Sequence, residues 1–312
     1  MRRRGHRPIL ARRTRHGSPY LRRLGGVTEA SLPAFLASAS PDLGWTVDPG
    51  PILMVLVLCG LYLPRWWKVR REIGPAKAPI LRLLSFLLGI AFLVLALLSP
   101  IDNLAAQSFT FHMAQHILLL DLAPICLIAS LNKVILRPAT RRLQALERAL
   151  GPLMHPAVAV VLYIALMWAW HVPGLYDSAL NSDIVHILEH LCFLGVGLLY
   201  WWQLLSPIRP RLGDGVMAPL IYMASTKLGV GILGIALTFA PDPLYRPYEV
   251  REQIFGFTAA SDQQLGGELM ALEQTIVMGV ALAFLIFRAL ERSEREQRRR
   301  EALEDRAAAG EG

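Results

Sequence analysis

Residues 80–99 read ILRLLSFLLGIAFLVLALLS and carry a single charge, at Arg82. An apolar run of about 17 to 25 residues crosses the roughly 30 Å hydrocarbon layer of a bilayer as a helix, because a helix satisfies its backbone hydrogen bonds internally. The whole chain has the same character: of its 312 residues, 54% are hydrophobic and 18% are charged, and the mean hydropathy is +0.41. This composition predicts a polytopic membrane protein.

Similar apolar runs recur along the chain and predict an all-α fold, a membrane bundle of seven transmembrane helices. The predicted spans are 48–66, 80–99, 108–131, 156–172, 184–205, 216–240 and 266–288. Residues 48–290 are therefore expected to form one transmembrane domain. The charged tail 291–312 is predicted to continue the seventh helix into solvent near anionic lipid. Because this tail lacks aromatic side chains that stack on bases, we expect no nucleic-acid partner.

The distribution of basic residues predicts the orientation of the bundle. Regions 65–77 and 133–148 carry five Lys or Arg residues each, whereas regions 101–107 and 173–183 carry none. Loops rich in Lys and Arg remain on the cytoplasmic side of the membrane. We therefore expect a cytoplasmic C-terminus and, with seven spans, an N-terminus outside.

The N-terminal residues conflict with this orientation. Residues 1–23 contain nine arginines, no apolar segment of a signal peptide follows them, and residues 24–47 are too polar for an eighth helix. We interpret 1–47 as a doubtful arginine-rich leader and an extracytoplasmic tail, with translation starting near Val27 as a hypothesis. Without residues 1–26 the formal net charge falls from +8 to −1, so the basic pI predicts no partner. Sequencing of the mature N-terminus tests this hypothesis.

Three cysteines, Cys59, Cys126 and Cys192, fall in three different predicted spans and form no C-x-x-C pair. This arrangement favours neither a disulfide framework nor a thiolate metal site. We expect them to be small packing residues.

Histidines gather at one depth when they are placed on the predicted topology. Two pairs are four residues apart, so the members of each pair share one helix face. A fifth histidine ends the fourth span, in "MWAWHVPGLY", and all five lie just beneath the outer surface. Isolated ionisable groups in lipid cost several kcal/mol, which favours a shared site inside the bundle. The predicted metal ligands are His112, His116, His171, His186 and His190.

Neighbouring polar residues are assigned lesser roles. Imidazole binds copper, zinc and iron, and Met113 adds a thioether suited to Cu(I). Glu189 is expected to orient a histidine from outside the ligand set. Asp121 lies roughly 140° around its helix from His116, too far for the same ion. Because Asp121 and Lys227 lie at equal depth, we predict an ion pair between them.

Two other kinds of site remain open at this point. The sequence "HILEH" at 186–190 matches the H-x-x-E-H signature of an intramembrane metallohydrolase, with Glu189 as general base, although no downstream acidic ligand is evident. A haem held between histidines on facing helices is another possibility. Only His155 is predicted near the inner surface, so at most one haem would fit.

Several motifs together resemble the multi-span CtaG family of cytochrome c oxidase assembly factors. They are "SPIDNL" at 99–104, "FHMAQHILLLDLAP" at 111–124, "WHVPGLYDSAL" at 170–180, "HILEH", "DPLYRPY" at 242–248 and "DQQLGG" at 262–267. The resemblance implies a multi-pass protein of the bacterial plasma membrane, not an enzyme, that helps to make haem–copper oxidase of the caa type. It also implies that Asp102 and the turn 262–267 lie near the histidines. Glu268 departs from the expected apolar residue and either turns outward or joins the site.

The predicted function is that of an assembly factor that binds copper transiently on the extracytoplasmic side and passes it to an oxidase subunit. Copper transport or resistance is one alternative, since the same histidines would serve as an entry port. Intramembrane hydrolysis is the other alternative. The expected partners are the oxidase and membrane lipid.

Overall fold

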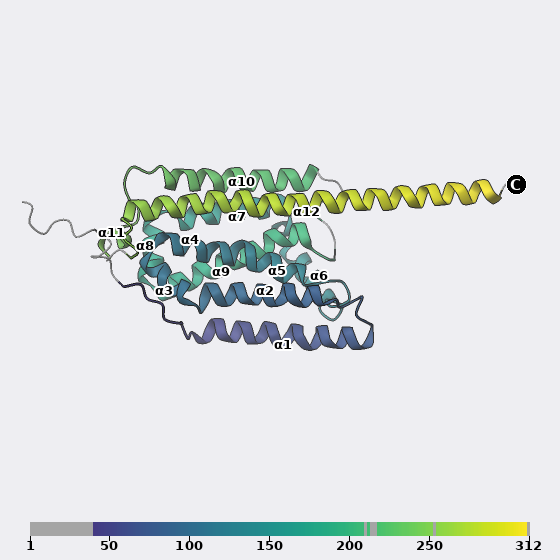
Figure 1. The fold of residues 1–312 in the computed structure, drawn as a ribbon, viewed down its shortest axis with the longest axis horizontal. Helices are drawn as coiled ribbons and strands as arrows, with labels where there is room; N and C mark the ends of the chain where they lie inside the picture. Colours follow the sequence, from purple (N-terminus) through teal and green to yellow (C-terminus); the bar gives the residue numbers. More distant parts are fainter. Residues whose placement is uncertain (1–39, 209–210, 213–216, 252–253, 311–312) are drawn as a thin grey trace, which may run out of the picture.

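The computed structural model describes residues 40–208, 211–212, 217–251 and 254–310. These residues fold into a bundle of roughly parallel and antiparallel helices, and no β-strand occurs among them (Figure 1). The all-α prediction is therefore confirmed. The proposed start near Val27 and most of the predicted leader lie outside the described residues.

Six helical stretches are long and apolar enough to cross a membrane, and their bounds follow the predicted spans closely. They are α1 (Pro49–Glu72), α2 (Ile80–Leu97), the stretch Phe109–Ala129, α9 (Asp183–Leu205), α10 (Met217–Thr238) and α12 (Ala259–Gly310). The stretch Phe109–Ala129 consists of α4 (Phe109–Ile117), a π-helical segment (Leu118–Leu122) and α5 (Ala123–Ala129). As predicted, α12 continues beyond the bundle as a single charged helix (Figure 1).

The fourth predicted span is less regular. Helix α7 (Pro156–Trp170) has only 15 residues, and it qualifies as a span only together with α6 (Thr140–Leu150) and the short turn Gly151–Met154, from which it is bent by 70°. The break falls at His155, whose backbone is extended, as is usual for the residue before a proline. The bundle thus has six spans, or seven if the bent pair is counted as one.

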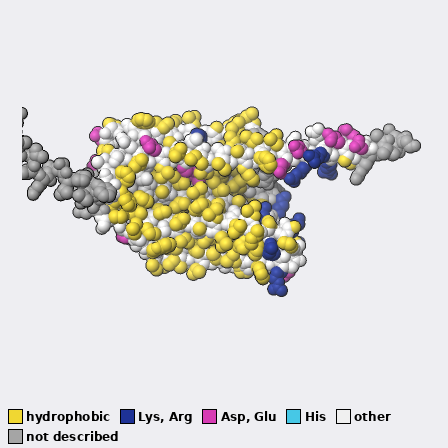
Figure 2. All heavy atoms as spheres, viewed as in Figure 1, with side chains coloured by type: hydrophobic (Ala, Val, Ile, Leu, Met, Phe, Trp, Pro, Cys, Tyr) yellow, Lys and Arg dark blue, Asp and Glu magenta, His cyan; other side chains and the backbone are white. Residues whose placement is uncertain are grey.

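The two ends of the bundle differ in character. Three short helices lie together at one end, which we call the histidine end (Figure 1): α3 (Pro100–Gln107), α8 (Pro173–Asn181) and α11 (Arg246–Val250). Lys and Arg side chains gather at the other end, around the exit of α12, and the face between the two ends is apolar (Figure 2). Leu61, Leu81 and Leu228, on three of the membrane-length helices, are exposed, which suits contact with lipid.

Glycines allow two close approaches between helices. A Cβ atom on Gly267 of α12 would lie 2.7 Å from the backbone nitrogen of Thr238 on α10. A Cβ atom on Gly197 of α9 would collide with the carbonyl oxygen of Leu120 in the π-helical segment. Backbone atoms cannot move aside as side chains do, so Gly267 allows α12 to pack closely on α10, and Gly197 allows α9 to pack closely on the histidine-bearing stretch.

Candidate metal centre

All five predicted histidines come together at the histidine end. Helix α4 supplies His112 and His116, the C-terminus of α7 supplies His171, and the first two turns of α9 supply His186 and His190. The ring centroids of His112 and His116 are 4.4 Å apart, and those of His186 and His190 are 4.1 Å apart. Contacts of 5.5 Å from His112 to His186 and 6.0 Å from His116 to His171 join the three helices.

Glu189 lies at the centre of this cluster. One carboxylate oxygen is 3.5 Å from His112 Nε2 and the other is 3.4 Å from His116 Nε2. These three residues are buried, and one donor atom from each lies within 4.8 Å of the other two. Sequence reasoning placed Glu189 outside the ligand set. The structure instead makes it a candidate ligand, because its side chain points from α9 toward the histidines of α4.

Most donor atoms of the cluster have no hydrogen-bond partner among the described residues. The unpartnered atoms are His112 Nε2, both ring nitrogens of His116, Nε2 of His186 and His190, and both oxygens of Glu189. Buried polar atoms are usually hydrogen-bonded, and leaving one unpaired costs about 1–3 kcal/mol. The distances from Glu189 also exceed the roughly 2.7–2.9 Å of a charge-assisted hydrogen bond. Imidazole nitrogens and a carboxylate arranged in this way suit a metal ion.

A hydrogen bond at one nitrogen of the His171 ring leaves the other nitrogen free for a metal. His171 Nδ1 lies 2.7 Å from the carbonyl oxygen of Met167, so Nδ1 carries the proton and donates it. Its Nε2 then has a free lone pair, 3.3 Å from the sulfur of Met113. An imidazole and a thioether thus lie side by side as possible soft donors, and a metal-binding role for Met113 stays a prediction.

A group of tyrosines encloses the histidines from α8 and α11. The Tyr248 hydroxyl donates to the Ala105 carbonyl at 2.7 Å, so its oxygen can accept from His112 Nδ1 at 3.3 Å. The Tyr176 hydroxyl is 3.2 Å from that of Tyr248, and Tyr245 donates to the His171 carbonyl at 3.0 Å. The sequence indicated no role for Tyr245 and Tyr248 beyond their place in the motif at 242–248. The two prolines of that motif indicated only that the segment is a connection between membrane helices.

Asp102 positions a helix and does not contact the metal centre directly. The Gln115 side-chain amide donates to Asp102 Oδ1 and to the Ala96 carbonyl, both at 2.7 Å. This bridge fastens α3 to α4, the helix that carries His112 and His116. Partial burial raises the pKa of Asp102.

Asp262 holds the start of α4. Its carboxylate accepts hydrogen bonds from the backbone of Phe109 at 2.7 Å, from the backbone of Thr110 at 3.1 Å and from the Ser108 hydroxyl at 2.8 Å. Residues 262–267 were expected to form a turn, but they are helical and lie near the N-terminus of α12. Glu268, in the same helix, is exposed and does not join the site.

Asp121 belongs to a second buried polar group, deeper in the bundle. Its carboxylate accepts from the Tyr163 hydroxyl at 2.8 Å and from Trp201 Nε1 at 2.7 Å, and it hydrogen-bonds the Glu273 side chain. Lys227 is exposed, so the predicted Asp121–Lys227 ion pair does not form. The prediction matched the two residues by depth, which says nothing about direction around the helix axis.

A small cavity lies between the histidine cluster and this deeper acidic group. Its volume of ≈ 10 Å³ is that of about one water molecule. The lining comes from both sides: Met113, His116, Met167 and Met270 border it together with Asp121, Glu273 and Gln274. One oxygen of Glu273 and one of Gln274 have no hydrogen-bond partner among the described residues.

Comparisons with known proteins agree with the motifs. The chain is similar to "Uncharacterized protein Mb0105" of Mycobacterium bovis and "Uncharacterized protein MT0111" of Mycobacterium tuberculosis, each 26% identical over 148 residues. The match covers 41% of this chain and only 22% of each relative. No solved structure matches the chain significantly. The profile of the family described as cytochrome c oxidase caa3 assembly factor (Caa3_CtaG) matches residues 60–292. This match covers most of the sequence, and the chain therefore belongs to the caa3-type cytochrome c oxidase assembly factor family.

Proposed function

We propose that this multi-pass bacterial membrane protein assists cytochrome c oxidase assembly by holding a copper ion in the histidine cluster and passing it to an oxidase subunit. Copper is the cargo in this scheme, and the protein needs no catalytic residue. Family membership supports the assembly role. The copper role is supported by the chemistry of the cluster.

The convergence of His112, His116 and Glu189 carries this proposal. Their donor atoms lie within 4.8 Å of one another in a buried site and lack other partners among the described residues. His171 with Met113, and the pair His186 and His190, surround this core as further donors. A cargo site must release its ion, and an open set of imidazoles exchanges ligands more readily than a closed thiolate cage.

The histidine end is proposed to face the extracytoplasmic side. Lys and Arg side chains gather at the opposite end of the bundle (Figure 2), which favours the cytoplasmic side for that end. Because the cluster lies near that end, copper would enter it from outside the cell. The copper would then pass by ligand exchange to an oxidase copper centre on the same side of the membrane.

Metal analysis of the purified chain tests the site. The double variant His112→Ala/His116→Ala is expected to lose most of the copper that wild type retains after dialysis. His155→Asn is the matched control, since His155 is exposed and only caps α7 through its Nδ1, a role that asparagine can fill. Equal copper content in the double variant and in wild type would contradict the proposal.

Deletion of the gene tests the role in assembly separately. We expect oxidase activity to be lost in the deletion strain and restored by added copper. Normal oxidase activity without the gene would exclude the assembly role, whereas loss without rescue by copper would exclude copper delivery.

Copper transport is a second candidate function, favoured by the small cavity between Met113 and Glu273. The cavity continues from the histidine cluster toward the two buried carboxyl groups, which would be a first step of a path through the bundle. Uptake of copper into vesicles that contain the purified chain tests this function, with Glu273→Gln expected to abolish uptake. Absence of uptake by wild type would exclude transport.

Hydrolysis is less well supported by the arrangement of "HILEH". Glu189 lies beside His112 and His116 of another helix, in the position of a ligand. A general base must instead remain free to take a proton from metal-bound water. We therefore expect no hydrolytic activity.

A further inference from the structure

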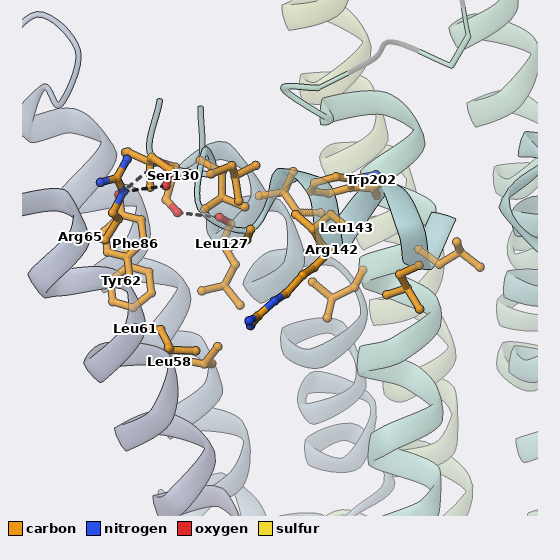
Figure 3. A pocket seen from close by; sticks show the side chains of 18 of the residues that line it. Leu58, Leu61, Tyr62, Arg65, Phe86, Leu127, Ser130, Arg142, Leu143 and Trp202 are labelled. Atoms are coloured by element: carbon orange, nitrogen blue, oxygen red, sulfur yellow. Dashed lines mark hydrogen bonds between the residues drawn. The ribbon is translucent and has the colours of Figure 1, made fainter. Parts of the chain in front are cut away.

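A large apolar groove lies near the basic end of the bundle and shares no residue with the metal centre. Its volume is ≈ 920 Å³. Helix α1 forms one wall, with Leu58, Leu61 and Tyr62, and the other wall includes Leu143 of α6 and Trp202 of α9 (Figure 3). Leu61 is 71% exposed and Leu146, which also lines the groove, is 54% exposed. The groove is therefore open to the surroundings of the bundle, which are lipid.

The length of the groove corresponds to one leaflet of a bilayer. Along α1 its lining runs from Met54 to Arg65. Eleven residues of helix rise roughly 16 Å, which is about half of the roughly 30 Å hydrocarbon core. The groove thus extends from near the middle of the membrane to the basic end. A membrane-spanning partner helix would need a surface that continues through both leaflets.

Two of the three charged residues that line the groove, Arg65 and Glu147, have polar partners within the protein. Arg65 donates to the carbonyl oxygens of Val134 at 2.7 Å and Ile135 at 3.1 Å. Glu147 accepts from Trp202 Nε1 at 2.9 Å and pairs with Arg211 at 3.0 Å. The Glu147 charge is thereby paired with Arg211, whereas Arg65 remains a cation whose guanidinium is held against backbone carbonyl groups between α5 and α6.

Arg142 is the exception. Its side chain extends from α6 into the groove, between the two apolar walls (Figure 3). It has no hydrogen bond or ion pair with any residue that the structure describes. Its guanidinium lies inside the groove at about the level of Leu61 (Figure 3), and a cation between apolar walls calls for an anion attached to hydrocarbon.

We propose that this groove binds one anionic phospholipid, with an acyl chain along α1 and α9 and the phosphate group at Arg142. The one-leaflet length, the apolar walls and the cation between them, which has no acidic partner among the described residues, are the three features that a phospholipid complements. Anionic lipids are attracted to Lys and Arg at membrane surfaces, so the headgroup adds affinity and selectivity to the apolar contact.

Native mass spectrometry of the full chain in detergent tests this site. Phosphatidylglycerol and phosphatidylcholine with the same acyl chains are added in equal amounts, and the bound fraction of each is measured. Wild type is expected to retain phosphatidylglycerol preferentially. Arg142→Gln is expected to reduce that retention about fivefold, the effect of removing one surface cation. Arg141→Gln is the matched control, because Arg141 is exposed on the same helix and does not line the groove.

A second variant addresses the apolar part of the site. Leu198→Trp fills the groove from α9 and is expected to reduce retention of both lipids. Equal binding of the two lipids by wild type, or equal loss in Arg142→Gln and Arg141→Gln, would overturn the proposal. Unchanged retention in Leu198→Trp would overturn it as well. None of these outcomes depends on copper, so the test is independent of the proposed function.

Discussion

The carboxylate of Asp262 accepts a hydrogen bond of 2.7 Å from the backbone N–H of Phe109, across 153 positions of sequence. Asp262 lies in the first turn of α12, whereas Phe109 begins the helix that carries His112 and His116. The first N–H groups of a helix have no partner within the helix, and a negative charge there also interacts favourably with the helix dipole. The last transmembrane helix thereby fixes the histidine-bearing helix in place.

Asp262→Ala tests this relationship. The substitution leaves buried N–H groups of Phe109 and Thr110 unpaired, and we expect a loss of about 2–4 kcal/mol in the free energy of unfolding. Copper retention should fall as well, because α4 is no longer held. Asp242→Ala is the control, since Asp242 is exposed. Equal stability of the two variants would show that the cap is unimportant.

Glu189→Gln tests whether the carboxylate is a ligand. Glutamine keeps the size and shape of the side chain but removes the negative charge that attracts a bound cation. We expect copper retention to fall about tenfold or more while the fold is kept. Glu268→Gln, an exposed change of the same kind on α12, should retain wild-type copper. If Glu189→Gln binds copper normally, the carboxylate does not belong to the ligand set.

A double-mutant cycle tests the environment of Asp121. Asp121→Ala leaves buried donors of Tyr163 and Trp201 without an acceptor, at about 1–3 kcal/mol for each group. Lys227→Ala is expected to change stability little, because the side chain is exposed. The two effects should add within about 0.5 kcal/mol. A larger coupling, measured by reversible unfolding in detergent, would restore the ion pair that the sequence predicted.

Much of the bundle could be predicted because lipid imposes strict limits on length and composition. The bounds of α2, for example, follow directly from where its apolar run begins and ends. Helix α7 was harder to predict. The prolines at 152 and 156 interrupt the helix near the basic end, and the bend there joins two helical segments that are each too short to span a membrane. Composition cannot reveal such a bend.

Clustering of the histidines was also predictable, since depth can be counted from the end of a span. Direction around the helix axis was not, which is why the sequence could not show that Glu189 lies beside His112 and His116, and why Asp121 was given the wrong partner. Tyr245 and Tyr248 were missed for a different reason. They reach the site from the connection between α10 and α12, and no periodicity in the sequence predicts where such a connection folds back.

Gly197→Ala tests the packing of α9 against the π-helical segment. A Cβ atom at this position would collide with the carbonyl group of Leu120, and a backbone group can move only if the helices separate. We expect a loss of about 1–3 kcal/mol in stability, typical of overpacking. Because Glu189 lies two turns away on the same helix, copper retention should fall too. Gly195→Ala offers a matched control, since a Cβ atom there meets nothing within 4 Å. Its stability should equal or slightly exceed that of wild type, owing to the better helix propensity of alanine. Equal unfolding midpoints for the two variants would mean that α9 does not depend on this contact for its position.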